Sequence, residues 1–210
     1  DKVFAIGPRL MERVKEVRTK EIYELIPGMV QIKKNDIYND RAIIAYGRFE
    51  GNITQVKQSH LIFAAFGRAV KMMNNNKDYV LHIIGSPSAE ENQKLRVLAE
   101  TYAERKLSIH FLEYIQDRKV LFDCIRNNSV GLMVSLSEGF GLAGWEMIAL
   151  GIPLIFTQKS GLYDFLDEKF GYLLNGMCLP VDLKGSSEDN ICEEDVQMIA
   201  DRIVTVLRQP

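Results

Sequence analysis

The sequence has few cysteines and almost no excess of charge. Its 210 residues include only three cysteines, Cys124, Cys178 and Cys192, and their spacing fits neither a zinc site nor a redox pair. An odd number without such spacing indicates reduced thiols of a cytosolic protein, not a disulfide framework or a structural zinc. The formal net charge of −2 excludes a protein that binds nucleic acid through bulk positive charge. Any anionic ligand must therefore be held by local cations.

Long hydrophobic runs and clustered histidines are missing as well. No segment has the length and apolarity of a transmembrane helix, and the first residues show no signal-peptide pattern, so we expect a soluble, intracellular protein. The histidines, His60, His82 and His110, do not have the spacing of a metal site or of a nucleophile's partner, and we interpret them as structural. No general base is visible. Hydrophobic residues make up 47% of the chain, enough for a sizeable core.

From residue 42 onward, apolar runs alternate with stretches of helical periodicity. We predict strands at 42–47, 79–85, 108–112, 130–134 and 153–156, and helices at 59–73, 90–104, 117–126, 143–150 and 193–207. Short runs at 161–166 and 172–174 close the series. Strands separated by helices of this length predict an α/β fold with a Rossmann-like, doubly wound parallel sheet.

The first forty residues have a different character. A strand is expected at 2–7, a charged helix at 10–18, and a proline-glycine turn at 25–28. We interpret residues 1–40 as a fragment of a neighbouring lobe plus a hinge, and residues 41–192 as the main domain. Residues 193–210 form a terminal helix that we expect to pack outside the main sheet.

The most informative stretch is residues 135–146, with the sequence SLSEGFGLAGWE. It connects the strand at 130–134 to the helix at 143–150, so a glycine turn leads into a helix N-terminus, where free N–H groups and the helix dipole attract anions. Gly139 and Gly141 allow a ligand to approach the main chain. Glu138 and Glu146 can face one crevice at the carboxyl end of the strand, and each carboxylate can accept hydrogen bonds from a vicinal diol of a sugar. An ordinary βα unit with solvated glutamates, or a hydrolase-like acid pair, remains an alternative for these residues alone.

Two cations are expected at the same edge of the sheet. Arg48 ends the first core strand, and Lys57 opens the helix that follows. A guanidinium offers paired donors and an ammonium offers a point charge, so the two together suit a diphosphate. The alternative is a pair of solvated surface cations.

The stretch around Glu138 resembles the donor-binding motif of the GT-B glycosyltransferases, specifically the large retaining family 4. The match runs from Ser135 through Glu138 and Glu146 to Ala149, Gly151 and Pro153. The resemblance implies that the chain is the C-terminal, donor-binding lobe of such an enzyme, with residues 41–192 as its nucleotide-sugar-binding domain. Only the last unit of the acceptor-binding lobe would then be present in residues 1–40.

The resemblance also implies roles for individual residues. Arg48, Lys57 and Glu138 would be the catalytic residues. Tyr114 follows Glu113, where the family often has glycine, and it could stack on the base or pack on the surface. Ser160 stands in place of one glycine of a family pair. The donor-binding residues implied in this way are Gly139, Phe140, Gly141, Leu142, Ala143, Glu146, Tyr114, Ser160 and Gly161.

By the same resemblance, the protein transfers a sugar from a nucleotide-diphosphate sugar, with UDP or GDP as the nucleotide, to an acceptor hydroxyl with retention of configuration. The donor is a substrate, no further cofactor is required, and cations replace the metal of other glycosyltransferases. The acceptor is a carbohydrate, a lipid or a protein, and nucleic acid is not expected as a partner. The location is cytoplasmic, with membrane contact through the acceptor-binding lobe. The alternatives are a non-catalytic module that senses or scaffolds through its nucleotide-sugar pocket, and a GT-B sugar-nucleotide epimerase.

Overall fold

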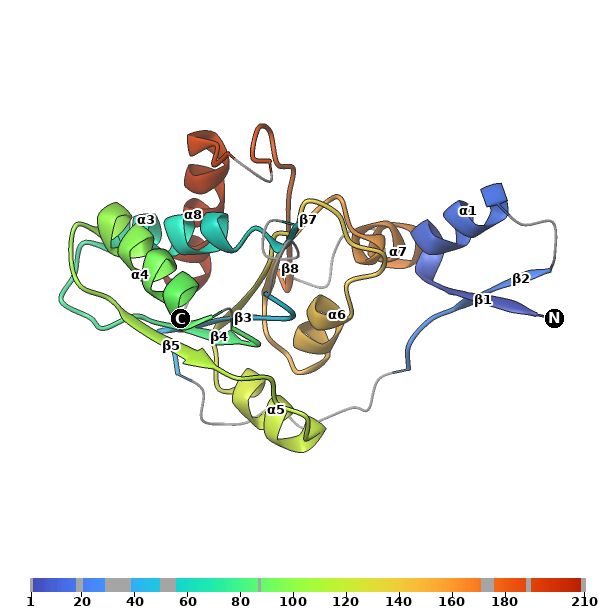
Figure 1. Cartoon of the computed structure of the whole chain (residues 1–210), viewed down its shortest axis with the longest axis horizontal. Coiled ribbons are helices and arrows are strands. Elements are labelled where there is room, and N and C mark those ends of the chain that lie inside the picture. Colours follow the sequence, from blue (N-terminus) through green and yellow to red (C-terminus); the bar gives the residue numbers. More distant parts are fainter. Residues whose placement is uncertain are drawn as a thin grey trace.

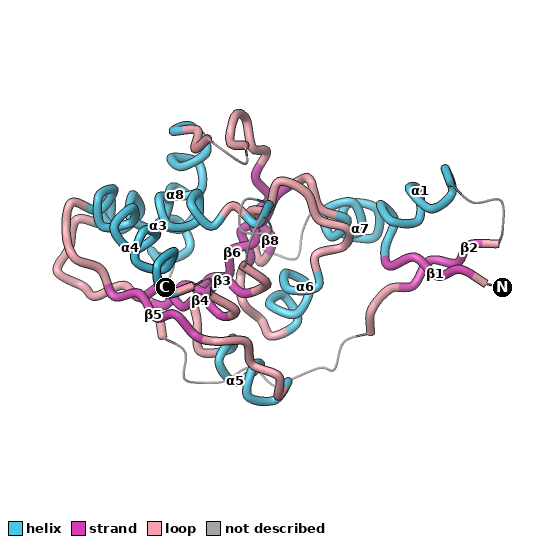
Figure 2. The backbone as a smooth tube through the Cα atoms, in the orientation of Figure 1, coloured by secondary structure: helices cyan, strands magenta, loops and turns pink. Residues whose placement is uncertain are grey.

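A six-stranded parallel sheet forms the centre of the molecule. The computed structural model describes residues 2–17, 21–28, 39–49, 56–86, 88–170, 176–187 and 190–208. The order of the strands across the sheet is β5-β4-β3-β6-β7-β8, and each neighbouring pair is parallel (Figure 1, Figure 2). Their bounds are β3 Ala42–Tyr46, β4 Val80–Ile84, β5 Ser108–Leu112, β6 Val130–Met133, β7 Leu154–Thr157 and β8 Cys178–Val181.

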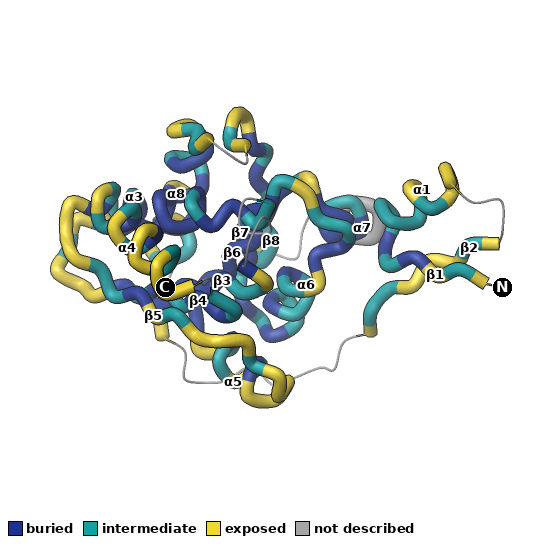
Figure 3. The backbone as a smooth tube through the Cα atoms, in the orientation of Figure 1, coloured by how far each residue is buried: buried dark blue, intermediate teal, exposed yellow. Residues whose placement is uncertain are grey.

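Helices cover both faces of this sheet. One face carries α3 (Ser59–Met73), α4 (Ala89–Ala103) and α8 (Glu193–Arg208), and the other carries α5 (Arg118–Arg126), α6 (Leu142–Ala149) and α7 (Gly161–Phe170) (Figure 1). Each face has its own cluster of buried apolar side chains. Figure 3 marks much of the central sheet as buried. The predicted α/β, Rossmann-like, doubly wound sheet is therefore confirmed.

The positions of the strands explain their composition. Every residue of β6 and β7 is buried, as are the first four residues of β3, because helices cover both sides of these central strands. The outer strands β5 and β8 are more exposed. Strand β8 contains Pro180, which is tolerated because an edge strand has one side without a pairing partner.

From residue 42 onward, most predicted elements lie within one or two residues of their observed bounds, with three differences. The run at 161–166 belongs to a helix, α7, and strand β8 was not predicted. The run at 172–174 lies outside the described residues. The terminal helix does not pack outside the sheet: Val196, Ile199 and Ile203 of α8 are buried in the same cluster as Phe63 of α3. Their apolar side chains face the sheet because they recur with helical spacing.

Residues 2–17 and 21–28, which we call the N-terminal unit, lie at one end of the molecule (Figure 1). They form a small parallel sheet of β1 (Val3–Ile6) and β2 (Ile22–Leu25), connected by α1 (Gly7–Val17). The sequence predicted β1 and α1 but only a turn near β2. Helix α1 packs against α7. Arg9 forms a bidentate salt bridge with the Asp164 carboxylate, with N–O distances of 2.8 and 3.1 Å.

The chain reverses its direction of winding between β3 and β6. Strands β3, β4 and β5 follow one another toward one edge, whereas β6, β7 and β8 follow one another toward the other edge. Because β3 and β6 are parallel neighbours, with Ile43 opposite Val130, their carboxyl ends lie at the same edge of the sheet. Open α/β sheets bind ligands in the crevice at such a switch point. The segments that follow β3 and β6 are therefore the place to look for a site.

Candidate functional site

Glu138 lies in the turn between β6 and α6, and its main chain is fixed by the loop after β7. Its N–H donates to the carbonyl of Lys159 at 3.0 Å, and its carbonyl accepts from the N–H of Gly161 at 3.2 Å. The side chain accepts a hydrogen bond from the Ser135 hydroxyl at 2.9 Å and forms an ion pair with Lys57. The carboxylate is thus held in place while keeping acceptor capacity for a ligand.

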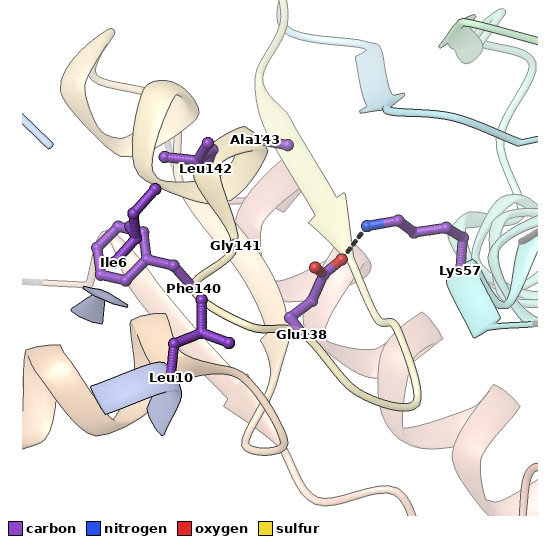
Figure 4. A pocket seen from close by; sticks show the side chains of 8 residues that line it. All are labelled: Ile6, Leu10, Lys57, Glu138, Phe140, Gly141, Leu142 and Ala143. Carbon is purple, nitrogen blue, oxygen red and sulfur yellow. Dashed lines mark hydrogen bonds and ion pairs between the residues drawn. The ribbon is translucent and has the colours of Figure 1, made fainter. Parts of the chain in front are cut away.

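Lys57 and Glu138 face one another across one side of a pocket of about 270 Å³ (Figure 4). Apolar side chains of the N-terminal unit, Ile6 and Leu10, lie on the other side beside Phe140 (Figure 4). The remaining lining residues are Gly141, Leu142 and Ala143. The first N–H groups of α6 have no partner within the helix. A pocket with a cation, a carboxylate and a helix N-terminus suits a ligand that carries both hydroxyls and an anion.

Glu146 lies on α6 and has different partners. Its carboxylate accepts the hydroxyl hydrogen of Tyr46, at the end of β3, and pairs with Arg118, at the start of α5. Burial, and next the charge of Glu146, raises the pKa of the Tyr46 phenol well above its ordinary value, so Tyr46 stays a donor at neutral pH. Glu146 does not line the pocket of Glu138. The two carboxylates expected in one crevice are therefore held separately, because Tyr46 and Arg118 hold the second one.

A second pocket, of about 330 Å³, lies where β3, β4 and β5 end. It is lined by Arg48 and Tyr114, which are both exposed, and by Gly47 and Gly85. Lys57 lines the first pocket and Arg48 the second, so the two predicted cations do not form a single clamp in this structure.

Ser160 and Gly161 support the turn around Glu138. The Ser160 side chain is buried, donates to the Thr157 carbonyl at 2.9 Å and accepts from the Tyr163 N–H at 3.2 Å. The resemblance implied a donor-binding role for Gly161, but in the structure its N–H bonds to the Glu138 carbonyl. Gly161 must also be glycine, because a Cβ there would clash with the carbonyl oxygen of Gly139.

The turn residues before α6 are divided between packing and the pocket. Phe140 is buried, and its ring centroid lies 6.1 Å from that of Trp145 and 5.8 Å from that of Phe165. Leu142 is exposed and Ala143 is half-buried at the mouth of the first pocket. Gly139 lies beside Leu10 of the N-terminal unit. The N-terminal unit therefore contributes directly to the walls of this pocket.

Several residues of the site were not identified from the sequence. Tyr46 directly precedes Gly47 and Arg48, and Arg118 directly follows the helix-capping Asp117, but neither position carries a motif. Ser135 was part of the motif without an assigned role. Ile6 and Leu10 lie in a segment that we assigned to another lobe, and only the folded arrangement brings them to Glu138.

The histidines line neither of the two pockets. His82 Nδ1 lies 2.8 Å from the Asn128 side-chain oxygen, the rings of His82 and His110 are 5.2 Å apart, and His60 lies 3.5 Å from Glu91. Among the described residues, no group of three or more histidines, cysteines or carboxylates could hold a metal ion. No helix within the described ranges has the length and apolarity to cross a membrane.

A family model described as "Family 4 Glycosyltransferase in conflict systems" matches residues 1–210. A search of curated proteins found no match.

Several solved structures share the fold at low sequence identity. A mutant of TarM from S. aureus, in complex with Fondaparinux, alpha-GlcNAc-glycerol and UDP, is 15% identical over 99% of this chain and 37% of its own, with a TM-score of 0.72. The pneumococcal O-GlcNAc transferase GtfA, in complex with UDP and GlcNAc, is 18% identical over 96% of this chain and 38% of its own, with a TM-score of 0.68. A UDP-forming trehalose-phosphate synthase from Burkholderia xenovorans is 20% identical over 81% and 37%, with a TM-score of 0.55. The chain thus spans less than two fifths of the length of each of these proteins.

Proposed function

The chain belongs to the family 4 glycosyltransferases of conflict systems, and on this premise we propose that it is the donor-binding lobe of a retaining glycosyltransferase. It would bind a nucleotide-diphosphate sugar and transfer the sugar to an acceptor hydroxyl. The observation that carries the proposal is the pocket at the N-terminus of α6, where Lys57 and Glu138 form an ion pair. The UDP complexes of the TarM mutant and of GtfA support the choice of donor class.

In this proposal the first pocket holds the sugar and the leaving phosphate. Glu138 accepts hydrogen bonds from sugar hydroxyls, while Lys57 and the first N–H groups of α6 stabilise the negative charge that develops on the departing diphosphate. Lys57 would move from the carboxylate toward the phosphate, or bridge the two, because an ammonium group has three donors. We assign Glu138 to binding and not to nucleophilic attack; the acceptor attacks from the face that the diphosphate leaves.

The nucleoside would occupy the adjoining edge of the sheet. Tyr46 and Arg118 each use one oxygen of Glu146, and an ionised carboxylate oxygen can accept a second hydrogen bond, so both oxygens can still bind a ribose diol. Arg48 would contact the diphosphate from the second pocket, and Tyr114 would stack on the base. The fixed cations take the place of a metal ion in this scheme.

The acceptor-binding region is proposed from the N-terminal unit. Ile6 and Leu10 contribute to the first pocket, which supports the interpretation of residues 1–40 as part of an acceptor-binding lobe. The acceptor would be a carbohydrate, a lipid or a protein. The enzyme would be cytoplasmic, with membrane contact made through that lobe.

Calorimetry with UDP and GDP tests donor binding by the 210-residue chain. Arg48→Ala, Lys57→Ala and Glu146→Ala should each weaken binding of the preferred nucleotide about 10- to 100-fold, the effect of losing a charge-assisted hydrogen bond. Lys94→Ala, which removes an exposed lysine paired with Glu90, is the control and should bind like the unaltered chain. Glu146→Ala should also bind UDP and 2′-deoxy-UDP equally. Unchanged affinity in all three site variants would sink the assignment.

A transfer assay separates an enzyme from a binding module. The full-length protein, supplied with acceptor and a panel of radiolabelled sugar nucleotides, should transfer label, and Glu138→Ala should abolish transfer. A protein that binds the nucleotide but transfers no sugar from any donor would instead be the non-catalytic sensing or scaffolding module.

A further inference from the structure

Gln58, the residue after Lys57, has an unusual backbone for its position. It precedes α3 with φ 56° and ψ 45°, in the left-handed region, and only 4% of its surface is exposed. The other non-glycine residues with positive φ in the described part of the chain are Asn74 and Glu104, which end helices, where this conformation is common. At the start of a helix the left-handed conformation is unfavourable for a glutamine, so other contacts must hold Gln58 in this conformation.

The Gln58 side chain is anchored to a loop near the C-terminus. Its amide Nε2 donates to the carbonyl of Ser187 at 2.9 Å. We call residues 184–187 the clasp loop, because the carboxylate of Asp195 on α8 holds it through three backbone N–H groups. The N–H donors are those of Lys184, Gly185 and Ser186, at 2.7, 3.2 and 2.7 Å.

The clasp loop is held in place by a buried, charged carboxylate, that of Asp195 on α8. Asp195 is fully buried. Burial alone would raise its pKa, but the hydrogen bonds from Lys184, Ser186 and Gly185 outweigh burial and hold the pKa of Asp195 below its ordinary value.

The other side of Lys57 is attached to the turn that carries Glu138. The carbonyl of Val56 accepts the N–H of Leu136 at 2.8 Å. Lys57 therefore lies between two residues that are hydrogen-bonded to other segments. Val56 is bonded to the turn after β6, and Gln58 is bonded to the clasp loop. The side chain of Lys57 projects from this braced segment toward Glu138 (Figure 4).

We propose that Gln58 is a positioning residue for Lys57, and that the clasp loop and α8 thereby belong to the donor site. The inference rests on the proposed function, because it assigns Lys57 to the donor phosphate. Gln58 does not line either pocket, and it acts through the main chain of the neighbouring lysine. Loss of the amide anchor would let residues 56–58 relax, so that the ammonium group would no longer be held in one place.

A double-mutant cycle with Lys57 tests the proposal. Gln58→Gly accommodates the left-handed backbone but removes the amide, and it should weaken binding of the preferred nucleotide about three- to tenfold, the effect of one hydrogen bond. In a Lys57→Ala background the same change should have no further effect, because the residue being positioned is gone. Gln58→Met keeps the length of the side chain without its donor and should match Gln58→Gly, so the test survives if one variant folds poorly.

Hydrogen exchange provides a measurement that needs no nucleotide. The N–H of Leu136 should exchange faster in Gln58→Gly than in the unaltered chain. Its acceptor, the carbonyl of Val56, is held less firmly once the hydrogen bond of the Gln58 amide is lost. The control Lys94→Ala should leave this rate unchanged.

The outcomes separate the two proposals. If Arg48→Ala, Lys57→Ala and Glu146→Ala all bind normally, or neither nucleotide binds the unaltered chain, the proposed function fails, whatever the exchange of Leu136 shows. If Lys57→Ala alone binds normally, the positioning role is overturned, because the residue being positioned does not contribute to binding. If Lys57→Ala weakens binding but Gln58→Gly does not, only the positioning role is overturned. An equal loss from Gln58→Gly in both backgrounds would show a general structural effect and would also overturn it.

Discussion

Gly161 is a residue at which one added carbon would disturb the site. A Cβ there would overlap the carbonyl oxygen of Gly139, and backbone cannot swing aside as a flexible side chain can. We expect Gly161→Ala to lower the free energy of unfolding by about 1–3 kcal/mol and to weaken nucleotide binding, since the turn of Glu138 would shift. Chemical denaturation measures the first effect. Gly28→Ala, whose Cβ would meet no atom within 4 Å, is the matched control. Equal stability of the two variants would contradict this account.

Charged residues of the site were identified from the sequence more readily than their partners. Glu138 and Lys57 follow strands in a recognisable pattern, and they do form a pair. The separation of Glu146 from them could not be predicted. It depends on the Tyr46 hydroxyl and the Arg118 guanidinium, which lie 100 and 28 residues away in the sequence. Periodicity indicates which face a residue occupies, but not which distant side chain will meet it there.

Among the elements, α8 is connected to the site through the clasp loop. Because the pKa of Asp195 is lower in the folded chain than the value of about 3.9 in the unfolded chain, its contribution to stability is present above about pH 4 and lost as the pH falls below it. Asp195→Asn should be less stable at pH 7 by about 2 kcal/mol, because N–H groups lose their charged acceptor. It should also lose less stability than the unaltered chain on acidification. Denaturation curves between pH 3 and 7 check both effects; parallel pH profiles would exclude the role of Asp195.

The elements predicted best are those with long apolar or periodic patterns. Helix α3 and strand β5 have the predicted bounds because their sequences are clearly periodic or bounded by polar residues. Strand β8 was missed because it is short and contains Pro180, which normally argues against a strand. Its position at the edge of the sheet is what permits the proline, and an edge position is a property of the sheet that a single segment does not reveal.

At the scale of the whole molecule, polar contacts of Arg9 connect the N-terminal unit to α7 and to the loop after β7. Arg9 forms a bidentate salt bridge with Asp164, and it also donates a hydrogen bond to the carbonyl of Gln158 at 3.3 Å. Arg9→Ala should lower the free energy of unfolding by about 1 kcal/mol and speed hydrogen exchange in α1, while Arg13→Ala, an exposed position on the same helix, should change neither. Unaltered exchange in α1 would mean that the apolar contacts alone hold the unit in place.

The docking of this unit was beyond prediction from the sequence. Arg9 and Asp164 are 155 residues apart, and nothing in either segment marks its partner. Gly7 has φ +76° and touches the ring of Phe140, so close contact with the motif requires a residue without a side chain there. The sequence set residues 1–40 apart from the main domain, but it could not show that Ile6 and Leu10 form a wall of the pocket.

Trp145, the chain's single tryptophan, is placed where these parts meet. Its indole N–H donates to the carbonyl of Pro27 at 3.0 Å, and its ring lies edge-on to Phe140 and Phe165. The molecule therefore carries an intrinsic fluorophore with one end on the N-terminal unit and its ring against the donor-binding turn. Emission from this one indole would report, without any label, both the seating of the unit and the arrival of a nucleotide.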